Sequence, residues 1–146
     1  MEDIQIDTLG YYVDRTFTHM VKFLNYELSA AGLDIQHSQF AILMVLSKKN
    51  GISLSQINKY INRDKASLSR NIKFLEDKGY IRRDFEGGKK KNIFLTERGN
   101  NILPIIYEIS QKDTDKTLKG FSESKRKAIY EILYKMYLNI STSIGN

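Results

Sequence analysis

The sequence predicts a mainly α-helical protein that carries one small β-hairpin. Apolar residues recur at three- and four-residue steps over most of the chain, which is the spacing of amphipathic helices. Only residues 80–95 read as strands, on either side of a glycine pair. With 146 residues, 41% of them hydrophobic and 27% charged, the chain is long enough for one hydrophobic core and too short for two ordinary domains. We therefore expect a single domain over residues 1–146.

Two helices are expected before residue 50. From about Thr8 to Ala31 the apolar residues keep helical spacing, and Gly32 follows where a C-terminal cap belongs. The segment 36–48 is almost continuously apolar, which predicts a helix that is buried on most sides, and Asn50-Gly51 ends it.

Two shorter helices follow, and each has a recognisable start. Ser53 and Gln56 form a capping-box pattern, and Asp64 is a good N-cap for the next helix. In that second helix the apolar positions form a narrow stripe, so the small and basic residues point to the opposite side. The apolar positions are Leu68, Ile72 and Leu75, and the opposite positions are Ala66, Ser69, Arg70 and Lys73.

A basic hairpin comes next. The strand-like segments 80–85 and 92–95 are joined by a loop that contains Gly87, Gly88 and three consecutive lysines. Thr96 then caps a helix that runs to about Lys119, and Ser122 caps the last helix.

The positive charge of the chain is concentrated in this central region. Residues 59–98 contain twelve basic and six acidic residues, so the formal net charge of +6 lies entirely there. A basic block inside folded elements, rather than on a tail, is typical of proteins that bind nucleic acid.

Two short helices with a tight turn, followed by a basic hairpin, form a winged helix–turn–helix pattern. Small side chains on the second helix would let it approach the DNA major groove, with basic residues in reach of bases and phosphates. Each feature alone is also typical of an ordinary solvated surface; their order makes DNA binding the better interpretation. The candidate DNA-binding residues are Ser53, Lys65, Ala66, Ser67, Ser69, Arg70, Lys73, Arg83, Lys89, Lys90 and Lys91.

Five short motifs lie along the expected helices and hairpin. They are Gln39-Phe40-Ala41-Ile42-Leu43, Ile52-Ser53-Leu54-Ser55-Gln56-Ile57, Asp64-Lys65-Ala66-Ser67-Leu68-Ser69-Arg70, Leu75-Glu76-Asp77-Lys78-Gly79-Tyr80-Ile81-Arg82-Arg83 and Leu95-Thr96-Glu97-Arg98-Gly99. Through these motifs the chain resembles the MarR family of transcription regulators over nearly its whole length. The resemblance implies a sequence-specific regulator with a winged-helix part at 36–98 and a helical dimerisation layer formed by 1–33 and 99–146. It also implies a homodimer on a pseudo-palindromic double-stranded DNA operator.

The hairpin departs from the family pattern. In the family an Asp-x-Arg sequence usually braces an arginine for the minor groove, whereas here Gly87 takes the Asp position and Lys89 the Arg position. Lysine keeps the charge but lacks the planar guanidinium fork. Phosphate binding by this hairpin is therefore the expected contact.

The first helix carries a second stripe, formed by Tyr12, His19, Phe23 and Tyr26. One interpretation is that this long helix is buried on two sides, between its own domain and a partner subunit. The other, which the resemblance implies, is a cavity for a small aromatic or anionic effector.

Several functions are not expected. The two histidines, His19 and His37, lie on different helices without a nearby carboxylate cluster, so we expect no metal site and no cofactor. The sequence shows no arrangement of a nucleophile with a nearby base, so we do not expect an enzyme. The chain has an acidic start and no apolar run that would span a membrane, which favours a cytoplasmic protein. The alternative that stays open is a nonspecific architectural or RNA-binding winged-helix protein.

Overall fold

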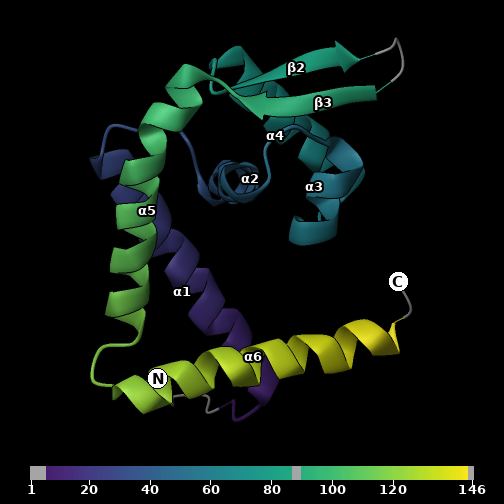
Figure 1. Cartoon of the computed structure of the whole chain (residues 1–146). Coiled ribbons are helices and arrows are strands. Elements are labelled where there is room, and N and C mark those ends of the chain that lie inside the picture. Colours follow the sequence, from purple (N-terminus) through teal and green to yellow (C-terminus); the bar gives the residue numbers. More distant parts are fainter. Residues whose placement is uncertain (1–5, 87–89, 145–146) are drawn as a thin grey trace. The chain divides into compact units, whose positions relative to one another are not determined.

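The computed structural model describes residues 6–86 and 90–144, and Figure 1 shows its helices and strands. In chain order they are α1 (Leu9–Ala30), α2 (His37–Lys48), β1 (Ile52–Ser53), α3 (Leu54–Ile61), α4 (Lys65–Asp77), β2 (Ile81–Glu86), β3 (Lys90–Leu95), α5 (Glu97–Thr117) and α6 (Glu123–Ser143). The predicted fold class, mainly helical with a small winged sheet, is confirmed. The chain forms two compact units, one ending at Asp113 and the other beginning at Thr114.

The helix starts lie where the polar capping residues predict them. Ser53 Oγ accepts a hydrogen bond from Gln56 N at 3.3 Å, while Gln56 Oε1 accepts from Ser53 N at 2.9 Å, which completes the capping box. Asp64 caps α4 in the same way through the Ser67 amide at 2.8 Å. Since each cap satisfies an otherwise orphaned backbone N–H group, these local contacts determine where α3 and α4 begin.

The sheet has a third strand that the sequence pattern did not predict. The strand order is β1-β3-β2, with Ile52 opposite Ile93 and Ile81 opposite Leu95, both pairs antiparallel. Gly51 precedes β1 with a φ of 73°, and a side chain there would collide with the Phe94 ring. Only glycine therefore turns the chain into β1 at this point.

The core of the first unit surrounds α2, which contacts α1, α3, α4 and β3 (Figure 1). Apolar side chains from α1 to α5 close around it. Tyr107 on α5 adds a hydroxyl–hydroxyl hydrogen bond of 2.6 Å to Ser47 on α2. The fully buried side chains of this core include Leu28, Ile42, Leu43, Leu46, Ile57, Leu68, Ile72, Leu75, Ile81, Ile93 and Ile106.

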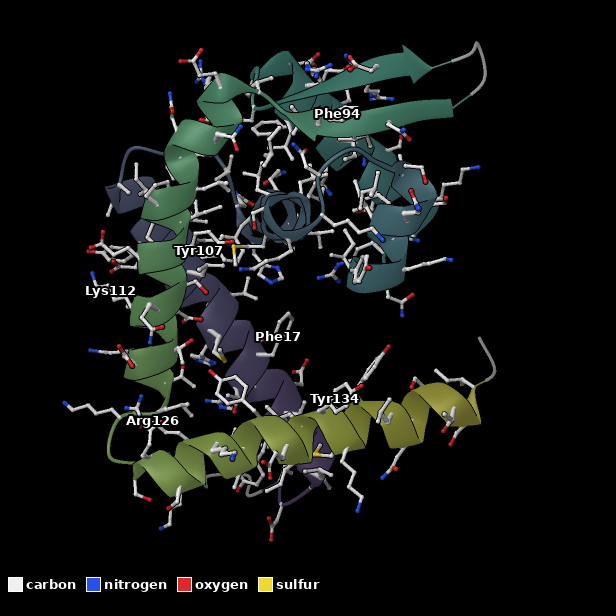
Figure 2. All side chains as sticks on the ribbon, viewed as in Figure 1. Phe17, Phe94, Tyr107, Lys112, Arg126 and Tyr134 are labelled. Carbon is white, nitrogen blue, oxygen red and sulfur yellow. The ribbon has the colours of Figure 1, made fainter. Side chains whose placement is uncertain are left out.

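The second unit exposes much apolar surface. In its described part, α6 has no buried residue, and Figure 2 shows Tyr134 on this helix. Its start is held by Arg126, whose guanidinium lies 3.0 Å from Asp115. The exposed apolar side chains of α6 and its end are Tyr130, Ile132, Leu133, Tyr134, Tyr137, Leu138, Ile140 and Ile144.

None of the described helices is both long enough and apolar enough to cross a lipid bilayer.

Candidate nucleic-acid interface

The connection between α3 and α4 is a tight turn. Asn62 closes α3 in the left-handed conformation, with a φ of 44°, and its amide bonds back to Asn58 O at 2.9 Å. The Asn58 side chain accepts the Arg63 amide at 2.9 Å, and Asp64 then caps α4. Asparagine tolerates this conformation better than most residues. The two helices are thus joined with little freedom between them.

α4 has one fully buried face and one exposed face. Leu68, Ile72 and Leu75 are completely buried, which fixes the rotation of the helix about its axis. The opposite face presents Lys65, Ala66, Ser69, Arg70 and Lys73 to solvent, whereas Ser67 is half-buried. The predicted candidates on this helix therefore share one face, with small residues in its first two turns.

Asn71 attaches this helix to α2, and the sequence analysis did not identify it. Its Oδ1 accepts hydrogen bonds from Gln39 Nε2 at 2.7 Å and from Ser38 Oγ at 3.3 Å, and its Nδ2 donates to Ser67 O at 2.9 Å. The only signal in the sequence was a polar residue next to the apolar stripe of α4.

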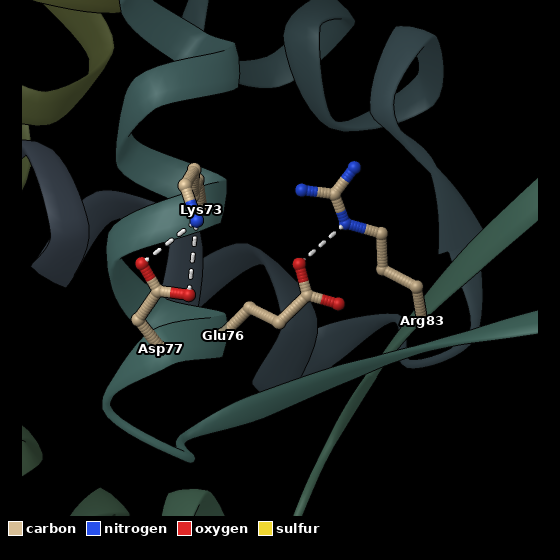
Figure 3. A network of polar contacts seen from close by, with 4 residues as sticks. All are labelled: Lys73, Glu76, Asp77 and Arg83. Atoms are coloured by element: carbon tan, nitrogen blue, oxygen red, sulfur yellow. Dashed lines mark hydrogen bonds and ion pairs between the residues drawn. The ribbon is translucent and has the colours of Figure 1, made fainter.

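Two of the predicted basic contacts are engaged by acidic residues of α4 (Figure 3). Lys73 Nζ lies 3.0 Å from Asp77 on the same helix, and Arg83 Nε of β2 lies 3.0 Å from Glu76 Oε2. The Lys73 side chain is 71% exposed, so solvent screens its ion pair, which adds little stability. The Arg83 side chain is only 24% exposed, and its ion pair braces the wing against α4.

The base of the wing is well defined by strand pairing. Arg83 lies opposite Ile93 and Asp84 opposite Asn92 in the antiparallel ladder. Arg82 stacks over the Phe94 ring at 4.8 Å and pairs with Asp84. The predicted contact Lys89, together with Gly87, lies outside the described residues, as do the side chains of Lys90 and Lys91.

The Ser53 side chain lies at the N-terminus of α3. Its hydroxyl caps α3 and also lies 3.0 Å from Ser55 Oγ. Ser55 itself is exposed at the start of α3. A hydroxyl at a helix N-terminus is suited to an anion such as a phosphate, although here its capping bond is already formed.

A cavity of about 110 Å³ lies in the first unit, between α1, α2 and α5. Phe17, labelled on α1 in Figure 2, meets the His37 ring edge-on with centroids 5.5 Å apart. Burial, and then the nearby charge of Arg63, lowers the pKa of His37; burial raises the pKa of Asp113. The lining residues are Phe17, Met20, Val21, Leu24, His37, Phe40, Ser110 and Asp113.

The four residues predicted to bind an effector lie elsewhere on α1. Tyr12 and Tyr26 are 51% and 67% exposed, His19 is exposed with Nδ1 2.7 Å from Arg15 O, and Phe23 is half-buried. They are not among the residues that line the 110 Å³ cavity. A second groove of about 310 Å³ lies between α1 and α5. Its lining includes Glu27, Glu108 and Lys112 and none of the four predicted residues.

The described residues include no group of three or more metal-ligating side chains that could hold an ion.

The exposed, partly basic α4 is the second helix of a helix–turn–helix, and the wing strands β2 and β3 follow it. This arrangement is that of a DNA-binding transcriptional regulator of the winged-helix class. Residues 35–84 match the model of the MarR family. Over 110 residues the chain is 28% identical to the uncharacterized HTH-type transcriptional regulator YybA of Bacillus subtilis, an alignment that covers 74% of this chain and 73% of that protein. The segment that matches this family model spans α2, β1, α3, α4 and the start of β2, and the relative matched over most of its length is a transcriptional regulator.

Solved structures agree with this assignment. The transcriptional regulator SlyA superposes with a TM-score of 0.85 at 26% identity, over 94% of this chain and 96% of that one. BpsR of Bordetella bronchiseptica, whose DNA binding is regulated by 6-hydroxynicotinic acid, superposes with a TM-score of 0.79 over 89% of this chain and 94% of that one. At 21% identity the BpsR match shows a shared fold.

Proposed function

We propose that this protein is a homodimeric, sequence-specific transcriptional regulator whose affinity for its operator is controlled by a small molecule. The observation that carries the proposal is the two-faced α4: Leu68, Ile72 and Leu75 are fully buried, while Ala66, Ser69 and Arg70 face solvent. A helix held this firmly, with small residues leading, is suited to enter the major groove.

The DNA contacts divide into two kinds. Ala66, Ser67 and Ser69 would allow close approach, and Arg70, which forms no ion pair within the described residues, would reach a base edge. The phosphate contacts would come from the hydroxyl and cationic groups around α4, which fix its register without reading sequence. These groups are Ser53, Lys65, Lys73 and the wing lysines Lys89, Lys90 and Lys91, with Arg83 holding the wing against α4.

Dimerisation is proposed from the uncovered apolar surface. Leu9 on α1 is 67% exposed and Ile140 on α6 is 66% exposed, and each belongs to a row of exposed apolar side chains. Such surfaces mark interaction sites in soluble proteins. We assign residues 1–33 and 99–146 to the dimer layer and 36–98 to DNA. A two-fold axis then requires a pseudo-palindromic operator with recognition helices about 34 Å apart.

Effector control is proposed for the cavity between α1, α2 and α5. The fold relative BpsR is regulated by a small ring compound, and this cavity shares the first turns of α2 with the attachment of α4. A ligand in this cavity would change DNA affinity only if its affinity for the DNA-binding conformation of the protein differed from its affinity for another conformation. Because Tyr12 and Tyr26 are exposed, we expect a partner subunit, rather than an effector, to pack against the stripe of α1 to which they belong.

The second candidate is a nonspecific architectural or RNA-binding protein, which the basic charge of the central region also fits. The proposed regulator would act on chromosomal DNA in the cytoplasm. The test is a footprint on the DNA flanking its own gene, with excess competitor DNA. A protected, roughly two-fold symmetric site supports the regulator, and uniform protection that competitor abolishes contradicts it.

A further inference from the structure

The wall of the cavity in the first unit includes an aspartate with one carboxyl oxygen that has no hydrogen-bond partner among the described residues. Asp113 on α5 is only 9% exposed, and its Oδ1 is buried with no hydrogen bond to any described residue. A buried acceptor without a partner costs stability, and a buried charge costs more, so such groups are rare unless they serve a purpose. Asp113 also lines the cavity, so its carboxyl group lies at the wall of a space that a ligand can enter.

The neighbouring cations do not supply the missing partner. Lys112, although next in sequence, forms an ion pair with Glu27 on α1 and lines the second groove instead. Arg63 lowers the pKa of His37 but does not line the cavity. Neither lysine nor arginine occurs among the lining residues. With His37 biased toward its neutral form, the cavity carries a negative charge whenever Asp113 is ionised.

The rest of the wall suits an organic cation. Phe17 and Phe40 contribute aromatic rings, and Met20 and Leu24 contribute apolar surface. Aromatic faces attract ammonium groups through the ring quadrupole, and a carboxylate forms a charge-assisted hydrogen bond with an ammonium N–H. A carboxylate or phenolate ligand would instead meet the charge of Asp113 at close range and pay for its own desolvation.

We propose that the effector is a small organic cation, an ammonium or protonated amine on an apolar or aromatic body, whose N–H group donates to Asp113. This rests on the proposed function, in which the cavity is the effector site. It differs from the small aromatic or anionic effector that the resemblance implies, because this ligand carries a positive charge. The cavity volume of about 110 Å³ is below the roughly 150 Å³ of an apolar cavity that holds benzene, so the body of the ligand can be at most one ring.

The test uses the full chain and three ligands of matched shape: benzylammonium, benzyl alcohol and benzoate, titrated calorimetrically at neutral pH. Benzylammonium should bind at least about tenfold more tightly than either of the others, as expected for a hydrogen bond to a charged group. In Asp113→Asn this preference should disappear. Glu108→Gln, which removes another α5 carboxylate outside the cavity, should leave the preference unchanged.

Three results would overturn the proposal: no binding of benzylammonium at millimolar concentration, equal or tighter binding of benzoate, or an unchanged preference in Asp113→Asn. The ligand series on the unmodified protein decides the matter even if the variant fails to fold. DNA binding is measured separately by fluorescence anisotropy. A cation preference that depends on Asp113 but leaves DNA affinity unchanged supports the ligand class and counts against effector control.

Discussion

The side-chain amide of Gln39 on α2 donates a 2.7 Å hydrogen bond to Asn71 Oδ1 on α4. The other end of the same amide, Gln39 Oε1, accepts the Gln36 backbone N–H at 2.8 Å as part of the α2 cap. Phe40, the next residue, lines the cavity. One turn of α2 therefore contacts both the proposed effector site and the proposed recognition helix.

Asn71→Ala should weaken this connection. It leaves the Gln39 amide without an acceptor and the Ser67 carbonyl without the Asn71 donor, so the free energy of unfolding should fall by about 1–3 kcal/mol. Operator affinity should fall as well, because α4 loses a fixed attachment. Urea denaturation and fluorescence anisotropy measure the two effects. Asn100→Ala removes a similar hydrogen bond, from the Asn100 side chain on α5 to the Thr96 carbonyl that precedes the helix; this variant is the control and should leave DNA affinity unchanged.

Arg70→Ala should relax sequence specificity. Arg70 is exposed on α4, so its loss should leave the folded state intact but cost about 1–3 kcal/mol of operator binding at one base position. Anisotropy titrations against operators with single base changes would locate that position. Lys119→Ala, an exposed cation of the second unit, serves as control. An equal loss of affinity for all DNA sequences would make Arg70 a phosphate contact instead.

The wing lysines should contribute to the salt dependence of binding. Changing Lys89, Lys90 and Lys91 together to alanine should weaken binding to every DNA sequence and flatten the plot of log affinity against log salt. The matched control is a triple alanine variant at Lys116, Lys119 and Lys127, which removes the same charge from the second unit. An unchanged slope in the wing variant would show that these lysines do not bind phosphate.

Leu133→Asp should disrupt the proposed dimer. Leu133 is 50% exposed within the apolar surface of α6, and a buried unpaired carboxylate at an interface is strongly unfavourable. Sedimentation equilibrium at micromolar concentration should show a dimer for the unmodified protein and a monomer for the variant. Lys135→Asp, at an exposed polar position of the same helix, should remain dimeric. A monomeric unmodified protein would contradict the assignment of this surface.

Asp113→Asn should stabilise the ligand-free protein at neutral pH. Burial raises the folded-state pKa of Asp113 above its ordinary 3.8, so the folded state holds this proton more tightly than the unfolded chain does. Stability therefore falls as pH rises from 3.8 through the folded-state pKa, and the cost persists above it. Thermal melts across this pH range should show a higher melting temperature for Asp113→Asn than for the unmodified protein at neutral pH, and little difference between the two below pH 3.8. Glu108→Gln, on the same helix but outside the cavity, is the control.

Local signals in the sequence predicted much of the fold, because helix caps act within three residues. Ser53 and Asp64 were identified in this way, and both cap the helices expected. β1 was missed because a two-residue strand has no periodicity, and its identity depends on pairing with Ile93 far along the chain.

The cavity could not be predicted for a related reason. Helical periodicity groups the aromatic residues of α1 but does not reveal which group another helix covers. Phe17 and Asp113 meet at the cavity only after α1 and α5 have packed around α2, and no spacing in the sequence joins them. Residues that depend on such distant packing were therefore beyond a motif-based analysis.

The pairing of β1 with β3 has a consequence for how tightly the protein can hold DNA. α3 begins at Leu54 directly after β1, and Asn92 of the wing strand lies opposite Ser53. The described wing strands are thus joined to the helix–turn–helix at two points, by the β1–β3 pairing and by the ion pair between Arg83 and Glu76. In the proposed DNA complex, seating α4 in the groove would bring the wing to the neighbouring DNA backbone at a high effective concentration. Most of the translational and rotational entropy of association would then be lost only once.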